Sequence, residues 1–99
     1  MIKPTKPQAG RGIDLIAELY PELIVFDQID DAIVGVGTIN QVMCVIYDEA
    51  SVINILTAEF DDDREAAVEW FEYNISQAYV GEGTPVFMTS ITTLEQQHD

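Results

Sequence analysis

The fold is decided by the stretch AIVGVGTINQVMCVIYD, residues 32–48, which has the composition of two strands and a tight turn. Ala32–Ile39 and Val42–Tyr47 are rich in the β-branched and apolar residues that favour strands. Asn40-Gln41 is the right length for a two-residue hairpin turn, and asparagine tolerates the positive φ that such turns require. The sequence therefore predicts a β-hairpin at the centre of the chain.

Apolar residues at helical spacing occur on both sides of this hairpin. Ile13–Tyr20 is predicted to be a short helix, because its apolar residues recur at helical spacing and Pro21 follows. Asp48 is suited to cap a second helix over residues 49–59, although frequent β-branched residues make a strand the competing interpretation. A third helix is predicted between the acidic run at 61–63 and the glycines at 81 and 83. The apolar face of this helix is predicted to hold Ala67, Trp70, Phe71, Asn74, Ile75 and Ala78.

The remaining segments complete a small single domain. Leu23–Phe26 is predicted to enter a strand or to pack as an extended cover, and residues 86–88 are predicted to form a short final strand. The element order α-β-β-α-α-β indicates an α+β fold, with a small antiparallel three-stranded sheet and helices packed on one face. The domain is predicted over residues 13–88. Residues 1–12, with two prolines and two glycines, are predicted to be a flexible basic arm, and residues 89–99 a polar C-terminal tail.

Charge restricts the class of partner. The chain has 18 Asp and Glu against 4 Lys and Arg, a formal net charge of -14. Direct binding to nucleic acid or to anionic membranes is not expected, because both kinds of binding depend on basic residues. The 47% of hydrophobic residues favours a folded domain over a disordered acidic segment. All 18 acidic residues lie in residues 13–99, where Arg64 is the only basic residue, so the predicted domain is more acidic than the whole chain.

No feature of the sequence indicates export, a membrane segment or catalysis. Apolar runs of signal-peptide or membrane-spanning length are missing, so a cytoplasmic location is expected. Cys44 is the only cysteine, and its apolar neighbours predict a buried free thiol. His98 is the only histidine and lies in the polar tail, so no nucleophile has an ordered histidine base and no enzymatic activity is predicted. A carboxylate-based enzyme stays open as an alternative, and no cofactor is expected.

Acidic residues cluster around the start of the third helix. The run at 61–63 lacks the spacing of a calcium-binding loop, so helix capping is preferred over a metal site and no metal is expected. Glu65, Glu69 and Glu72 follow at spacings of four and three, where like charges destabilise a helix by about 0.2–0.5 kcal/mol per pair. This surface is either merely solvated or meets a basic protein. The candidate partner-binding residues are Glu59, Asp61, Asp62, Asp63, Glu65, Glu69 and Glu72.

Four short patches carry a family resemblance. They are FD at 26–27 with DDAIVGV at 30–36, YD at 47–48, EA at 65–66 with FEYN at 71–74, and AYVGEGTP at 78–85. Together they resemble a family of small uncharacterised proteins of tailed bacteriophages and bacteria, over roughly residues 19–88. If the patches form one site, the resemblance implies that it contains Asp27, Asp31, Asp48, Asn74, Glu82 and Thr84. The alternative is that these residues make turns, caps and amide hydrogen bonds that define the fold.

Two functions of different classes follow from these observations. The leading hypothesis is a small acidic, phage-encoded interaction protein that binds a basic surface of a host protein, one that itself binds nucleic acid, in the host cytoplasm. The alternative is a self-associating structural or accessory domain whose acidity serves solubility only. In that case an exposed face or edge of the small sheet is expected to be covered by a second copy in a homodimer.

Overall fold

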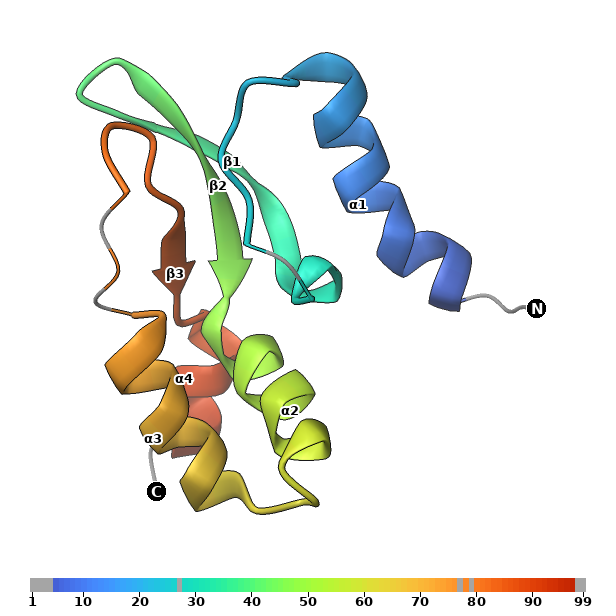
Figure 1. Cartoon of the computed structure of the whole chain (residues 1–99), viewed down its shortest axis with the longest axis vertical. Helices are drawn as coiled ribbons and strands as arrows, with labels where there is room; N and C mark the ends of the chain where they lie inside the picture. Colours follow the sequence, from blue (N-terminus) through green and yellow to red (C-terminus); the bar gives the residue numbers. More distant parts are fainter. Residues whose placement is uncertain (1–4, 27, 77, 79, 98–99) are drawn as a thin grey trace.

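The chain folds around a three-stranded sheet with strand order β1-β2-β3 (Figure 1). The computed structural model describes residues 5–26, 28–76, 78 and 80–97. Within them the strands are β1 (Ile33–Ile39), β2 (Val42–Asp48) and β3 (Val86–Met88), and the helices are α1 (Thr5–Leu19), α2 (Glu49–Glu59), α3 (Arg64–Asn74) and α4 (Ile91–Gln97), with a 3₁₀ turn η1 (Asp30–Ala32). The predicted α+β fold class is therefore confirmed.

The central hairpin is confirmed in position and in turn geometry. β1 and β2 are antiparallel, with Ile39 paired to Val42 across the turn. Asn40 and Gln41 have φ of 51° and 71°, which is the left-handed geometry of the turn that matches the twist of the flanking strands. The helix that follows β2 also has the predicted bounds, because the Oδ2 atom of Asp48 accepts a hydrogen bond from the Ser51 amide at 3.1 Å.

The prediction of an entirely antiparallel sheet is wrong for β3. This strand pairs with β2 in parallel, with Ile46 opposite Val86 and Asp48 opposite Met88. The reason lies in the connection between the two strands, because the chain leaves the end of β2 through α2 and α3 and then returns to the start of β2. A long helical crossover of this kind delivers a parallel strand, whereas a tight turn delivers an antiparallel one.

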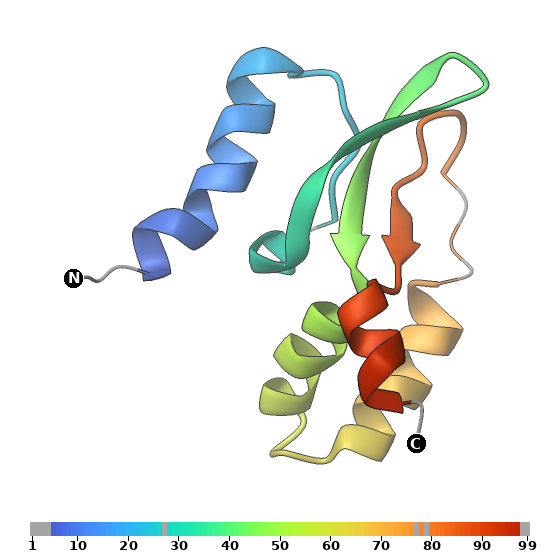
Figure 2. The ribbon, with the colours of Figure 1, turned by 180° about the vertical axis from the view of Figure 1, so that it is seen from behind.

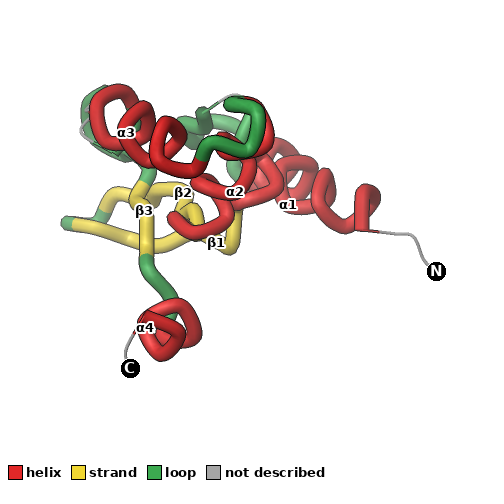
Figure 3. Tube along the Cα trace, turned by 90° about the horizontal axis from the view of Figure 1, so that it is seen from below, coloured by secondary structure: helices red, strands yellow, loops and turns green. Residues whose placement is uncertain are grey.

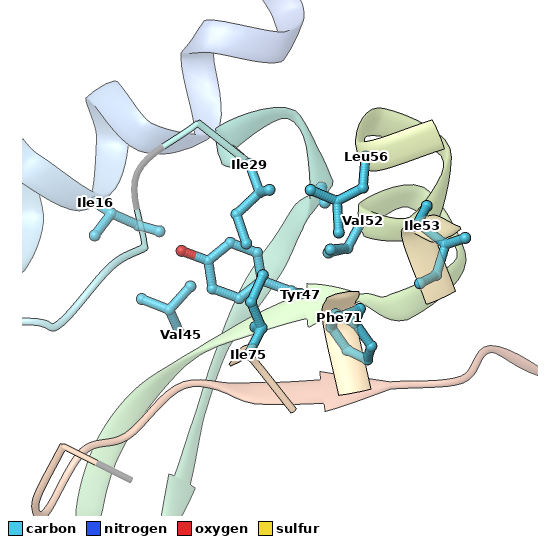
Figure 4. Close-up of a cluster of buried hydrophobic side chains, with 11 residues drawn as sticks. Ile16, Ile29, Val45, Tyr47, Val52, Ile53, Leu56, Phe71 and Ile75 are labelled. Atoms are coloured by element: carbon cyan, nitrogen blue, oxygen red, sulfur yellow. The ribbon is translucent and has the colours of Figure 1, made fainter. Parts of the chain in front are cut away.

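The core lies between the sheet and the helices α2 and α3. Val45 and Tyr47 of the central strand are fully buried, and they pack with Val52 of α2 and Phe71 of α3 (Figure 4). The hydroxyl of Tyr47 accepts a hydrogen bond from the Phe26 amide at 2.8 Å, which holds the segment before η1 against this core. Residues 23–26 therefore form an extended cover, one of the two predicted alternatives.

Both ends of the chain contain more helix than predicted. α1 begins at Thr5, inside the region predicted to be an arm. Pro7 does not prevent this helix, because it falls in the first turn, where a helix tolerates proline. Residues 1–4 of that predicted arm lie outside the described residues. In the predicted tail, the hydroxyl of Ser90 accepts a hydrogen bond from the Thr93 amide at 3.1 Å and so caps α4.

The positions of the helices around the sheet also differ from the prediction. α2 and α3 lie beyond the end of β2, on one side of the sheet plane, α4 lies on the opposite side, and α1 projects past the β1 edge (Figures 2 and 3). The helices are therefore not confined to the single face that the element order predicted. No helix in the described part of the chain combines the length and the apolar composition that crossing a membrane requires.

Candidate partner-binding surface

The turn between α2 and α3 displays its carboxylates by an unusual backbone geometry. Asp61 and Asp62 have φ of 57° and 66°, in the left-handed region that few residues other than Gly, Asn and Asp adopt. The Asp62 amide donates a hydrogen bond to the Thr57 carbonyl at 2.8 Å, which closes the turn on the end of α2. Both side chains are exposed, so this tight turn presents two adjacent carboxylates to solvent.

Asp63 caps α3, as the sequence predicted. Its Oδ1 atom accepts a hydrogen bond from the Ala66 amide at 3.1 Å, and its negative charge lies at the positive end of the helix dipole. The residue is nevertheless exposed. Asp63 therefore contributes both to the stability of α3 and to the charge of the surface around it.

The predicted acidic residues are all exposed. This holds for Glu59, Asp61, Asp62, Asp63, Glu65, Glu69 and Glu72. The three glutamates of α3 extend over about 10 Å of helix, at the 1.5 Å rise per residue of an α-helix. Arg64 lies among them but forms no ion pair with them in the described part of the chain. The negative charge of this surface is therefore not neutralised within the described structure.

Aromatic side chains lie directly beside the acidic row, which sequence reasoning missed. Trp70 is 41% exposed and Tyr73 is 77% exposed. Together with Phe60, whose ring centroid is 6.2 Å from that of Trp70, they line a hollow of about 340 Å³. Glu69 lines the same hollow, so a carboxylate and three aromatic rings face one space. We call the seven acidic residues together with Phe60, Trp70 and Tyr73 the acidic–aromatic surface.

Trp70 and Asn74 do not lie on the buried face of α3, so the prediction that placed them there is wrong. Ala67, Phe71 and Ile75 are buried, whereas Trp70 and Asn74 are exposed. Residues in a helix are separated by about 100°, so Trp70 is rotated well away from the face on which Phe71 lies. Asn74 donates from Nδ2 to the Trp70 carbonyl at 3.0 Å, a bond within its own helix.

The residues suggested by the family resemblance are dispersed over the described structure. Asp48 caps α2 at one end of β2, whereas the turn containing Glu82 and Thr84 lies near Met43 at the other end. A seven-residue strand is about 20 Å long, so these groups cannot act on one small ligand. Asp31 lies in η1 and Asn74 at the end of α3. Asp27 lies outside the described residues.

The turn at 81–84 has the features of a fold-defining element. Gly81 and Gly83 have φ of 107° and 85°, which favours glycine at both positions. The Thr84 hydroxyl accepts a hydrogen bond from the Val80 amide at 3.1 Å and donates one to the Gly81 carbonyl. This turn and the β-hairpin border a hollow of about 320 Å³, which Glu82 and Cys44 also line. The observed roles of Asp48 and Thr84 favour the interpretation that these residues shape the fold.

The described residues contain little that indicates another kind of site. No group of three or more His, Cys, Asp or Glu side chains among them is placed to hold a metal ion. Cys44 is a buried free thiol at 2% exposure, as predicted, and His98 lies outside the described residues.

No family model, no curated protein and no solved structure matches this chain. The resemblance to the phage family therefore stays a prediction, and the acidic–aromatic surface is the best-defined candidate site.

Proposed function

We propose that this protein binds a basic surface of another protein through its acidic–aromatic surface. The observation that carries the proposal is an exposed row of carboxylates next to exposed Trp70 and Tyr73. Like charges at positions 65, 69 and 72 disfavour α3 in the isolated chain by about 0.2–0.5 kcal/mol per pair. Basic side chains of a partner would remove this repulsion, so the same residues that cost stability would contribute affinity.

The aromatic side chains give the surface selectivity for cations that bear a planar or extended apolar group. Tryptophan and tyrosine are the residues that most often dominate binding energy in protein interfaces. An arginine or lysine over their rings gains about 0.5–2 kcal/mol from the cation–π interaction. Glu69 lines the hollow between Phe60 and Trp70, where it is placed to accept hydrogen bonds from the same cation.

The spacing of the carboxylates favours a partner whose basic surface also binds nucleic acid. The glutamates of α3 place one charge per roughly 5 Å, of the same order as the phosphates of one DNA strand at about 3.4 Å. In this proposal the chain is a phage-encoded protein that occupies the nucleic-acid-binding surface of a host protein in the host cytoplasm. The buried free thiol of Cys44 suits such a reducing compartment.

Binding of a labelled oligo-arginine peptide tests the proposal. We expect the wild-type protein to bind this peptide in about 0.15 M salt, where surface charges more than about 8 Å apart are screened. Changing Glu65, Glu69 and Glu72 together to Lys should weaken binding at least about tenfold, equivalent to about 1.4 kcal/mol. Trp70→Ala should also weaken binding while leaving net charge unchanged. The same triple variant should lose capture of its partner from host lysate.

A matched variant separates the position of the charges from their number. Glu22, Glu82 and Glu95 are also exposed, and changing them to Lys alters net charge by the same amount at distant positions. We expect this variant to keep its affinity within about threefold of the wild type, since the contacts at α3 remain. Equal losses in both triple variants would show that the peptide responds only to total charge, and the proposal would then be wrong.

A further inference from the structure

The described chain has more surface than a compact monomer of its size. Its accessible area is 6874 Å², whereas a folded monomer of 11.0 kDa has about 5,600 Å². The radius of gyration is 14.1 Å, against about 12.6 Å expected for this length. The excess of about 1,200 Å² is larger than the roughly 800 Å² that each partner buries in a standard protein interface. A surface is therefore available that a partner of ordinary size could cover.

α1 projects beyond the β1 edge of the sheet (Figures 1 and 3). Ile16 anchors this helix to the core at 8% exposure. Leu15 and Leu19 are 47% and 62% exposed on the same helix, and Val34 of β1 is 55% exposed. These three residues line one groove of about 250 Å³ between α1 and β1. We call the groove and these side chains the α1–β1 face.

The edge of the sheet at this face lacks the usual protection against pairing. β1 is an outer strand, and Ile33–Ile39 contains no charged residue and no proline. Exposed edge strands are commonly protected by such residues because their free amides and carbonyls pair readily with other strands. The register irregularity between Ile33 and Gly35 protects only the first part of β1. An uncharged edge next to an apolar groove indicates a surface that is covered in the working protein.

Charge favours a second copy of this chain as the partner. Every residue that lines the groove is uncharged, and β1 contains no charged residue, so this face carries no charge in a chain of net charge -14. Two copies that approach through any strongly acidic surface repel each other, and contact through the α1–β1 face keeps those surfaces apart. The face also holds both a groove and the exposed leucines that could fill it, as a self-complementary interface requires.

We propose that two copies form a two-fold symmetric dimer through the α1–β1 face. Leu15 and Leu19 of each copy pack into the groove of the other, next to Val34. α3 lies on the opposite side of the molecule from α1 (Figures 1 and 3), so the dimer leaves two acidic–aromatic surfaces open. Two sites on one particle can engage a partner that presents repeated basic segments with higher overall affinity than one site.

Sedimentation equilibrium of the full chain tests the dimer. We expect a mass of twice 11.0 kDa at micromolar concentrations. Leu19→Lys and Val34→Lys should each raise the dimer dissociation constant at least about tenfold, because a two-fold interface contains every substitution twice. Both side chains are more than half exposed, so both variants should keep the far-ultraviolet circular dichroism of the wild type.

Ile91→Lys provides the matched control. Ile91 is 70% exposed and belongs to α4, which lies on the side of the sheet opposite α2 and α3 and away from α1 (Figure 3). This variant should remain a dimer, and so should the triple lysine variant of α3. A wild-type chain that is monomeric across micromolar concentrations would overturn the proposal. A dimer that survives Leu19→Lys and Val34→Lys but dissociates in Ile91→Lys would also overturn it, since the interface would then be at α4.

Discussion

Tyr47 connects the sheet to the segment that covers it. The residue is fully buried, and its hydroxyl accepts a hydrogen bond from the Phe26 amide at 2.8 Å. Tyr47→Phe removes the acceptor and leaves this partly buried amide without that partner, so we expect a loss of about 1–3 kcal/mol in the free energy of unfolding. Urea denaturation measures this change. A loss below about 0.5 kcal/mol would show that water replaces the hydroxyl and that residues 23–26 are held by packing alone.

Asp63 allows the capping role to be separated from the charge. Asp63→Ala removes the acceptor for the Ala66 amide and should lower the free energy of unfolding by about 1 kcal/mol. Asp63→Asn keeps a capping oxygen and should cost much less, while it removes the same negative charge. Thermal unfolding of the two variants compares them. Equal destabilisation would mean that the charge at the helix dipole, rather than the hydrogen bond, is what stabilises the start of α3.

Within α3, stability and binding are expected to change in opposite directions. Glu69→Lys converts the like-charge pairs with Glu65 and Glu72 into opposite-charge pairs, which should raise the free energy of unfolding by about 0.8–2 kcal/mol. The same change places a positive charge in the hollow at Trp70 and should weaken binding of the oligo-arginine peptide. Denaturation and peptide titration on one sample measure both effects. A variant that is less stable, or that binds equally well, would contradict the proposed role of the row.

Local sequence patterns predicted the elements whose ends are set by neighbouring residues. The hairpin follows from the strand composition on both sides of Asn40-Gln41, and α2 begins where Asp48 provides a cap. The direction of β3 was not predictable in this way, because it depends on the path of the chain through α2 and α3. The helical part of the predicted arm was missed since Pro7 and two glycines dominated the pattern, although a first turn tolerates proline.

The candidate site was predictable in its charge but not in its aromatic part. All seven acidic residues are exposed, as expected for a surface that is either solvated or meets a partner. Trp70 was assigned to the buried face because apolar residues at helical spacing usually pack inward. In the structure α3 ends at Asn74, and its buried stripe is narrow: it consists of Ala67 and Phe71, with Ile75 at the C-cap, which leaves Trp70 beside the glutamates. The sequence did contain a signal of this exposure. The apolar stripe predicted for α3 is wider than the stripe that the core can bury, so part of it had to remain exposed.

At the scale of the whole molecule, repulsion between carboxylates limits stability. The chain has principal extents of 36 × 35 × 27 Å, and its net charge is -14. At about 0.01 M salt the Debye length is about 30 Å, so nearly all the charges interact, whereas at about 1 M it is about 3 Å. We expect Tm to rise with sodium chloride, by about 4–8 °C for each kcal/mol of repulsion removed. Circular dichroism melts measure this rise, and a constant or falling Tm would contradict it.

Binding of a basic segment at α3 is tested most directly by residue-resolved NMR of the isotope-labelled protein titrated with the oligo-arginine peptide. We predict shift changes at the amides of residues 60–74 and at the indole of Trp70, with little change at the α1–β1 face. Changes centred on the α1–β1 face or on the hollow near Glu82 would contradict the proposed binding surface. Small changes spread evenly over all exposed acidic residues would show that the acidity attracts cations without forming a site.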